Sequence, residues 1–173
     1  TKFDELLQLY PTGITPSTIT LILKHINTIP SDFNALPKIN RLLKSAESLI
    51  QNKVLDWGLA ELLAFGSILV EGKDVRMSGQ DVKRGTFSHR HALFFDEDHN
   101  TEHNRLQNIQ SAQGSFRIFN SLLSEFAVLG FEYGYSLASP NTLVIWEAQF
   151  GDFANGAQVM IDQFITSAES KWG

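Results

Sequence analysis

LLSEFAVLGFEYGYSLASPNTLVIWEAQF, residues 122–150, decides the fold class, because it joins a helical pattern to the pattern of a buried strand. Residues 122–139 carry apolar side chains at helical spacing, whereas residues 141–150 form a short apolar run of strand-forming types. The same order occurs upstream, where DWGLAELLAFGSILVEG (56–72) predicts a helix and DVRMSGQD (74–81) predicts a short strand that enters a polar turn. Helices that alternate with buried strands indicate an α/β fold with a mainly parallel sheet flanked by helices.

The remaining elements follow from the same patterns. Apolar spacing predicts one helix over 18–26, with Thr15 or Ser17 as its cap, and a second helix over 38–50. HALFFD (91–96) predicts a further strand, and FANGAQVMIDQFITSAESKW (153–172) predicts a closing helix. We therefore expect the N-terminal segment, residues 1–53, to consist of helices and loops.

Composition excludes several classes of protein. The chain has 173 residues, 43% of them hydrophobic, which is enough for one full core. Its net charge of -5 carries no block of like charges, so we expect neither a nucleic-acid nor a membrane partner. Without cysteine there is no disulfide or thiolate chemistry, and we expect an intracellular, soluble protein. Because the chain starts without Met and stops directly after a predicted helix, we expect a piece of a longer polypeptide.

Glu125 lies at the start of the mainly apolar helix predicted for 122–139. Ser124, or nearby Asn120 or Ser121, would cap this helix and place Glu125 in the first turn, where the helix dipole favours a negative charge. The apolar positions predict burial on more than one side. From the residues alone, a structural role as a cap or as the partner of an arginine is an open alternative to a functional role for Glu125.

Gly130 and Gly134 lie four positions apart and therefore on one face of the same helix. Because glycine has no side chain, another backbone can approach that face closely. We expect a helix–helix contact there, within the chain or across a dimer axis.

Three polar segments fall at the predicted carboxyl ends of strands, where open α/β sheets bind their ligands. They are SGQDVKRGTFSHRHA (78–92), the start of the helix at Glu125, and WEAQFGDFANGAQ (146–158). In the last segment, Phe150 and Phe153 could form a wall on which a flat heterocycle stacks. Core packing is the alternative for these two rings.

Taken together, these segments resemble the decarboxylating component of the 2-oxoglutarate dehydrogenase complex over residues 54–173. Glu125, Gly130, Phe131 and Gly134 have the spacing E-x4-G-aromatic-x2-G, which is similar to the pyrimidine-binding signature of thiamin-diphosphate enzymes. The resemblance implies a transketolase-like pyrimidine-binding module and an enzyme that oxidatively decarboxylates 2-oxoglutarate. The succinyl group would pass to a lipoyl-bearing acyltransferase.

The resemblance also implies that half of the cofactor site is missing from this chain. Thiamin diphosphate and Mg²⁺ are the implied cofactors, and the diphosphate and the metal would be held by a second module with a G-D-G motif, from the other subunit of a homodimer. We therefore expect the isolated fragment to be inactive and no metal ligands within it. The implied location is the cytoplasm in bacteria or the mitochondrial matrix in eukaryotes.

The resemblance carries roles onto individual residues. Glu125 matches the catalytic glutamate that hydrogen-bonds the aminopyrimidine ring and activates the cofactor. Leu123 matches the bulky residue that holds the cofactor bent, and Phe150 and Phe153 match the aromatic side chains against the pyrimidine. His89 would face the substrate or relay a proton, with His91 the weaker candidate. Asp81 would orient the cofactor or its loop, or else only cap a turn.

Other interpretations remain open at this stage. Another 2-oxo acid dehydrogenase or decarboxylase of the same fold would keep Glu125, and a non-catalytic dimerisation module would keep only the glycine face. His99, Glu102 and His103 spell the H-x-x-E-H pattern of some zinc peptidases, which requires a helix. Because the surrounding residues are polar, we expect a loop or hairpin there and no zinc site.

Overall fold

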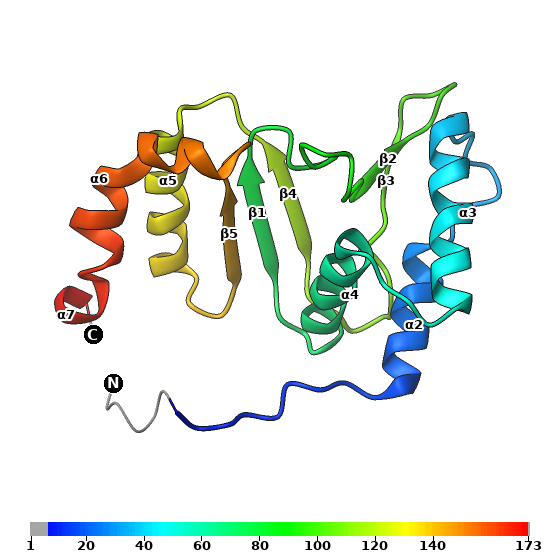
Figure 1. Ribbon diagram of the computed structural model, residues 1–173, viewed down its shortest axis with the longest axis horizontal. Coiled ribbons are helices and arrows are strands. Elements are labelled where there is room, and N and C mark those ends of the chain that lie inside the picture. The colour runs from blue at the N-terminus through cyan, green and yellow to red at the C-terminus, as the bar shows by residue number, and fades with distance from the viewer. Residues whose placement is uncertain (1–6, 173) are drawn as a thin grey trace.

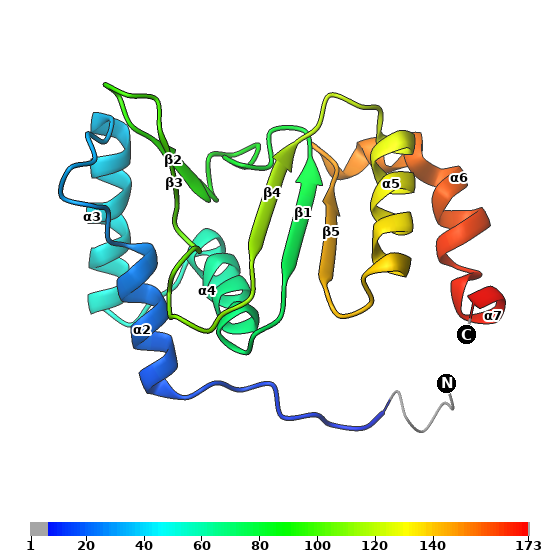
Figure 2. The same cartoon turned by 180° about the vertical axis from the view of Figure 1, so that it is seen from behind.

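The computed structural model describes residues 7–172, apart from the side chains of Asp152 and Trp172 (Figures 1 and 2). The N-terminal part contains the helices α2 (Pro16–Ile26), α3 (Pro37–Gln51) and α4 (Trp57–Val70). The strands are β1 (Val75–Gly79), β2 (Leu93–Phe95), β3 (Glu102–Asn104), β4 (Phe116–Asn120) and β5 (Leu143–Glu147). Helix α5 (Glu125–Ala138) joins β4 to β5, and the chain ends in η1 (Gly151–Ala157), α6 (Gln158–Met160), η2 (Ile161–Ile165) and α7 (Ala168–Trp172).

A parallel sheet of order β4-β1-β5 forms the centre of the fold. Val75 at the start of β1 pairs with Phe116 of β4 and Leu143 of β5, and Gly79 at its end pairs with Asn120 and Glu147. All three strands therefore end at one edge, which is the upper edge in Figure 1. The predicted α/β class with a parallel sheet is confirmed.

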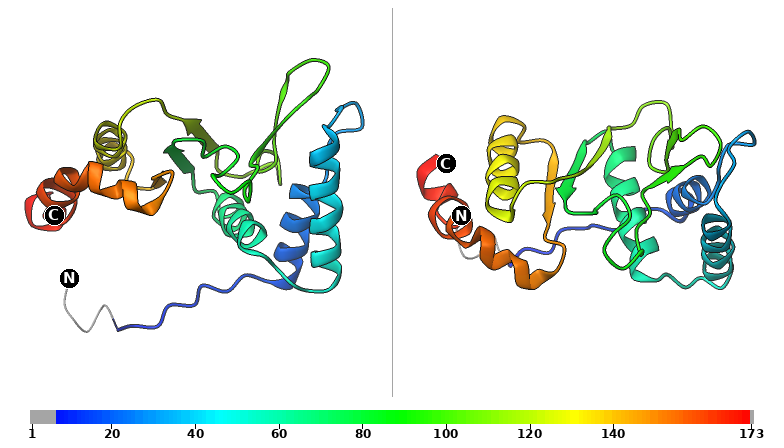
Figure 3. Two further views of the ribbon diagram at one scale, coloured as in Figure 1. Left: turned by 45° about the horizontal axis from the view of Figure 1, so that its top comes forward. Right: turned by 90° about the horizontal axis from the view of Figure 1, so that it is seen from above.

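Helices cover both faces of this sheet. Successive side chains of a strand point to opposite faces, and in β1 Val75 and Met77 are buried in one core cluster with Leu62 of α4 and Ile22 of α2. Arg76, between them, points the other way and bonds Glu132 of α5. Helices α2 and α4 thus lie on one face and α5 on the other (Figure 3).

Three of the predicted helices begin at an expected cap residue. The side chains of Thr15, Asp56 and Ser124 accept hydrogen bonds from the backbone at the first turns of α2, α4 and α5. Helix α4 ends before Gly72, whose φ of +79° suits glycine. These boundaries depend on local chemistry, which explains why the sequence alone locates them.

The strand prediction missed one strand of the main sheet and misplaced another strand. FRIFN forms β4 in the main sheet, although no strand was predicted there. HALFFD contributes β2, but this strand pairs antiparallel with β3 in a separate two-stranded sheet. There Phe94 packs with Ala35 and Ile39 next to α3. Strand β4 has only five residues, and two of its side chains are buried, so its local sequence pattern is weak. Its place in the sheet depends on pairing with β1, which is distant in the sequence.

The C-terminal helix and the burial of α5 also differ from expectation. Residues 151–172 form a 3₁₀ turn, a short α-helix, a π-helical turn and a last α-helix rather than one helix. Helix α5 buries only Val128, Leu129 and Glu132, while Phe131 remains 59% exposed. A Cβ added at Gly130 would lie 3.1 Å from the side chain of Met160, whereas one at Gly134 would meet nothing within 4 Å. Among the described residues of this chain, the predicted helix contact is therefore found at Gly130, against α6, and not at Gly134.

Within residues 7–172, no helix combines the length and the apolar character needed to cross a membrane.

Candidate functional site

The three polar segments predicted to lie together do meet at the carboxyl edge of the main sheet. The loop after β1 contains Gln80 and His89, α5 follows β4, and η1 follows β5. Thr86 donates a hydrogen bond to the carbonyl oxygen of Gln149 at 2.8 Å, which joins the first segment to the third. Because the three strands are parallel and end at paired residues, the segments that follow them lie at the same edge of the sheet.

Glu125 lies in the first turn of α5 and is half-buried. The amide of Gln80 donates to its Oε1 at 3.5 Å, and a Cβ added at Gly156 would lie 3.4 Å from its Oε2. Among residues 7–172, no lysine or arginine forms an ion pair with this carboxylate, and Ser124 caps the helix instead. The carboxylate is therefore a hydrogen-bond acceptor without a cationic partner in the described residues.

Three aromatic rings form a wall at the same edge. The ring of Phe150 makes edge-to-face contacts with those of Phe87 and Phe153, each with 5.8 Å between centroids. Phe150 and Phe153 are 46% and 45% exposed, so both keep free ring surface. The wall can accept a flat ligand by offset or edge contacts. Rings packed in a core would be buried, so the exposure of Phe150 and Phe153 does not support the core-packing alternative.

A cavity of about 700 Å³ opens beside this wall. Phe87, His89, Glu147 and Phe150 belong to its lining, whereas Glu125, Leu123 and Phe153 do not. The predicted residues therefore fall into two neighbouring groups on one edge, one around Glu125 and one around His89.

The imidazole of His89 is held by two neighbours. Its Nε2 lies 3.3 Å from Nη2 of Arg90, and because a guanidinium only donates, Nε2 is the acceptor. Its Nδ1 is buried without a hydrogen-bond partner, and the ring packs so closely on Gly85 that a Cβ there would lie 2.5 Å from Cε1. The geometry favours the tautomer with the proton on Nδ1.

Arg90 was not predicted as a site residue, although it organises this group. It is fully buried and bonds both oxygens of Glu61 at 2.7 and 2.8 Å and both oxygens of Glu147 at 3.1 and 2.5 Å. Burial lowers the pKa of Arg90, but the hydrogen bonds to the two carboxylates outweigh it, so the pKa is raised. The only signal in the sequence is an arginine between two histidines just before the apolar run of β2.

Glu61, His89 and Glu147 lie close enough to hold a metal ion in principle, and so do Asp96, Asp98 and His99. In the first group Arg90 already donates hydrogen bonds to both carboxylates. In the second group the carboxylate of Asp96 accepts from the backbone N–H groups of residues 34, 98 and 99. We assign neither group as a metal site.

The H-x-x-E-H segment forms the β2–β3 hairpin and not a helix, as expected. Its three side chains have separate contacts. The ring of His103 packs on Phe94, Glu102 pairs with Lys83 at 2.8 Å, and His99 lies 3.1 Å from Asp96. This arrangement does not match a zinc peptidase.

Asp81 follows the central strand β1, and Leu123 follows the neighbouring strand β4. Asp81 has a positive φ of 58°, pairs with Arg84, and its carbonyl oxygen accepts from the N–H of Gly85 at 2.9 Å, so it stabilises a turn. Leu123 is 54% exposed and lines a cavity of about 200 Å³ on the α5 face of the sheet.

Arg76 and Glu132 form a second ion pair that the sequence analysis missed. Nε and Nη2 of Arg76 donate to Glu132 at 2.7 and 2.9 Å. The guanidinium also lies over three rings, with centroids 4.6, 5.4 and 4.5 Å away for Phe119, Phe131 and Tyr135. Glu132 lies two helical turns after Glu125, and as the second acid of an apolar helix it could have been recognised.

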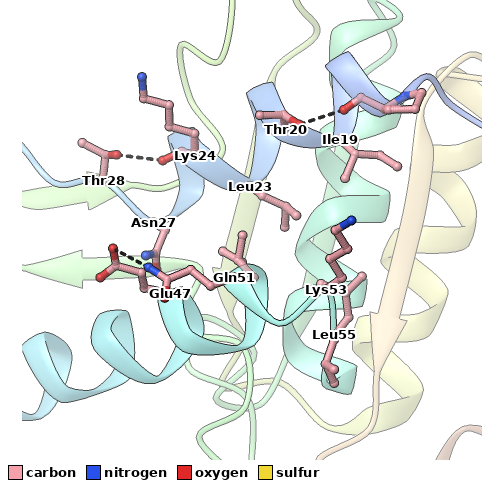
Figure 4. Close-up of a pocket in the computed structure, with 13 residues that line it drawn as sticks. Ile19, Thr20, Leu23, Lys24, Asn27, Thr28, Glu47, Gln51, Lys53 and Leu55 are labelled. Carbon is pink, nitrogen blue, oxygen red and sulfur yellow. Dashed lines mark hydrogen bonds between the residues drawn. The ribbon is translucent and has the colours of Figure 1, made fainter.

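A larger cavity than the one beside Phe150 lies away from these residues. It measures about 800 Å³ between α2 and α3 and is lined by residues from the first third of the chain, among them Ile19, Leu23, Lys24, Glu47 and Lys53 (Figure 4). None of its lining residues belongs to the carboxyl edge of the sheet, so cavity size alone does not locate the candidate site.

Comparison with known proteins agrees with this geometry. The family described as "Transketolase, pyrimidine binding domain" matches residues 53–173. "2-oxoglutarate dehydrogenase, mitochondrial" of Schizosaccharomyces pombe is 51% identical over 169 residues, and the protein of that name in Caenorhabditis elegans is 50% identical over 167 residues. "2-oxoglutarate dehydrogenase E1 component" of Brucella ovis is 49% identical over 162 residues.

These alignments cover 97%, 96% and 93% of this chain but only 17%, 16% and 16% of the relatives. The chain thus spans about one sixth of their length. The fold and the resemblance expected from the sequence are confirmed.

Proposed function

This chain belongs to the family of transketolase pyrimidine-binding domains, and we propose that it supplies the pyrimidine-binding half of a thiamin-diphosphate site in a longer enzyme that decarboxylates 2-oxoglutarate. The observation that carries the proposal is Glu125. Its carboxylate opens a helix at the carboxyl edge of the sheet, with no cationic partner in the described residues. The names of the relatives support the choice of 2-oxoglutarate.

The residues present fit an aminopyrimidine ring. Glu125 offers an acceptor for a ring N–H, the bare backbone of Gly156 leaves space beside that acceptor, and Phe150 and Phe153 offer exposed ring surface. A flat heterocycle with a polar edge needs these three features. When bound, thiamin diphosphate supplies a carbon nucleophile that attacks the 2-oxo carbon and accepts the electron pair left by carbon dioxide.

Each predicted residue has a distinct part in this proposal. Glu125 holds a proton at the pyrimidine nitrogen, and Leu123, Phe150 and Phe153 restrict how the cofactor can lie. His89, held by Arg90, faces the substrate. Asp81 acts through its turn on the orientation of the loop, which makes it a positioning residue. Mg²⁺ and the diphosphate bind to a module outside this chain.

The exposed apolar surface supports a dimer in which a second subunit completes the site. Leu122, Leu123, Phe126 and Phe131 at α5 and Phe119 of β4 are all exposed in this chain. Patches of this kind mark interfaces between proteins. In the proposed complex a lipoyl-bearing acyltransferase accepts the succinyl group. The compartment is the mitochondrial matrix for a eukaryotic parent and the cytoplasm for a bacterial one.

The test is 2-oxoglutarate-dependent reduction of an artificial electron acceptor by the full-length parent with thiamin diphosphate and Mg²⁺. We expect Glu125→Ala to abolish the activity, while the control Glu47→Gln, an exposed acid on α3, retains it. Equal activity in Glu125→Ala and the wild type would contradict the role of Glu125. Activity with a different 2-oxo acid would reassign the substrate, and its absence with every 2-oxo acid would favour a dimerisation module.

A further inference from the structure

We propose that a further cavity, of about 430 Å³ between α3, the start of α4 and residues 88–91, is a binding site for a small oxyanion, a carboxylate or a phosphate. Lys38, Arg41, Ser45, Ser88, His91 and Arg105 provide its polar lining. No role was assigned to this cavity by the proposed function, and the inference does not depend on it.

Two buried nitrogen atoms of this lining lack hydrogen-bond partners in the described residues. Arg105 is 1% exposed, and its Nη2 has no hydrogen-bond partner. Its other nitrogens bond only backbone carbonyl oxygens, that of Ile26 at 2.7 Å and those of residues 90 and 91 at 3.4 Å. His91 is 8% exposed, and its Nε2 is also without a partner. Buried polar groups are normally satisfied, so both nitrogens are available to bind a ligand in this cavity.

The rim adds positive charge and hydroxyl groups. Lys38 and Arg41 on α3 are exposed, and Nζ of Lys38 reaches the hydroxyl of Ser88 at 3.5 Å. Asp56 is the only carboxylate among the lining residues, and its Oδ1 already accepts from the N–H of Leu59 at 2.8 Å. Outside the lining, Arg84 also approaches Ser88, but Asp81 pairs with it.

The electrostatic field supports the same interpretation. Burial lowers the pKa of His91 to about 4, and Lys38, Arg105 and Arg84 lower it further than Asp81 raises it. Burial also lowers the pKa of Arg105 to about 10. In a chain with a net charge of -5, this cavity is a local concentration of positive charge. An anion would compensate it.

The chemistry of the lining restricts the ligand. Guanidinium and ammonium groups only donate hydrogen bonds, and carboxylate and phosphate oxygens only accept them. His89 lines both this cavity and the one beside Phe150, so a bound anion would lie next to the candidate active site. The bound anion is either one carboxylate of a dicarboxylate or the phosphate group of a separate effector.

The test is calorimetric titration of the complete chain at low ionic strength with glutarate and, separately, with inorganic phosphate. We expect at least one anion to bind and the double variant Lys38→Gln/Arg41→Gln to weaken it about tenfold or more, which corresponds to about 1.4 kcal/mol. The matched control is Lys24→Gln/Lys53→Gln, which removes the same charge at the cavity between α2 and α3. The control should bind like the wild type.

A site-specific signal completes the test. The chain has five histidines, and we expect the imidazole NMR resonances of His91, assigned with His91→Asn, to shift on adding the anion. Binding of glutarate alone indicates the dicarboxylate source, and binding of phosphate indicates the effector. No binding of either anion, or equal weakening in both double variants, would overturn the proposal. Circular dichroism checks that the two double variants, which change exposed side chains only, and His91→Asn, which changes a buried one, remain folded.

Discussion

Arg90 and Arg105 are both fully buried, yet their surroundings have opposite character. Arg90 meets two carboxylates, from α4 and from the end of β5, and its pKa is raised. Arg105 lies over Phe94 at 4.8 Å and bonds backbone carbonyls only, and its pKa is lowered. A buried charge is stable only when it is paired or well hydrogen-bonded. Arg90 therefore has carboxylate partners within the chain, whereas Nη2 of Arg105 has no partner in the described residues and can bind an anion.

The comparison is tested most strongly at Arg90. We expect Arg90→Met to lower the free energy of unfolding by about 3–5 kcal/mol, because it leaves Glu61 and Glu147 close together without their cation. Urea denaturation measures this loss. Adding Glu61→Gln and Glu147→Gln to the variant should recover part of it. If the triple variant is as unstable as the single one, the ion pairs do not explain the contribution of Arg90.

The next effect concerns pH at the Arg105 cavity. Because the pKa of His91 is about 4 in the folded chain and 6.5 ordinarily, the unfolded chain binds more protons between these values. Stability is therefore lost as the pH falls from 6.5 to 4, by up to about 3 kcal/mol. Unfolding at pH 4 and 6.5 should show a smaller difference in His91→Asn than in the wild type. Equal differences would contradict the burial of an uncompensated imidazole.

Arg105→Met should lower the free energy of unfolding by about 1–2 kcal/mol, which is less than the loss expected for Arg90→Met. The variant loses hydrogen bonds to carbonyl oxygens but also removes a charge that has no carboxylate partner in the described residues. Urea denaturation of both variants under one condition gives the ranking. A larger loss for Arg105→Met would show that Arg105 is structurally satisfied after all.

The smallest effect is expected at the exposed pair of Asp81 and Arg84. Exposed ion pairs contribute little to stability, so Asp81→Asn should leave the unfolding midpoint unchanged within error. The affinity of the parent enzyme for thiamin diphosphate, measured in the same variant, decides the role of Asp81. Unchanged affinity would limit this residue to its turn, and weaker binding would support its proposed positioning role.

Prediction from sequence succeeded where the signal is local. The caps Thr15, Asp56 and Ser124 act within one helical turn, so their residue types suffice to locate the helix starts. Prediction failed where partners are distant. Strand β4 exists because it pairs with β1, and β2 leaves the main sheet because it pairs with β3.

The candidate site divides in the same way. Glu125, Phe150 and Phe153 were recognised from their spacing and from the family resemblance. Arg90, Arg76 and Glu132 were missed, because an arginine or a glutamate in an apolar segment does not reveal its partner. Arg90 lies 29 residues from Glu61 and 57 from Glu147, and Arg76 lies 56 residues from Glu132.

By itself, the sequence determined the alternation of helices and strands, the position of Glu125 in the first turn of its helix, and the family. These depend on spacing and on residue types a few positions apart. Only the tertiary structure decided which buried charges are compensated and which residues share a cavity. Such contacts depend on the crossover of the chain around the sheet, which brings distant residues together and removes them from water.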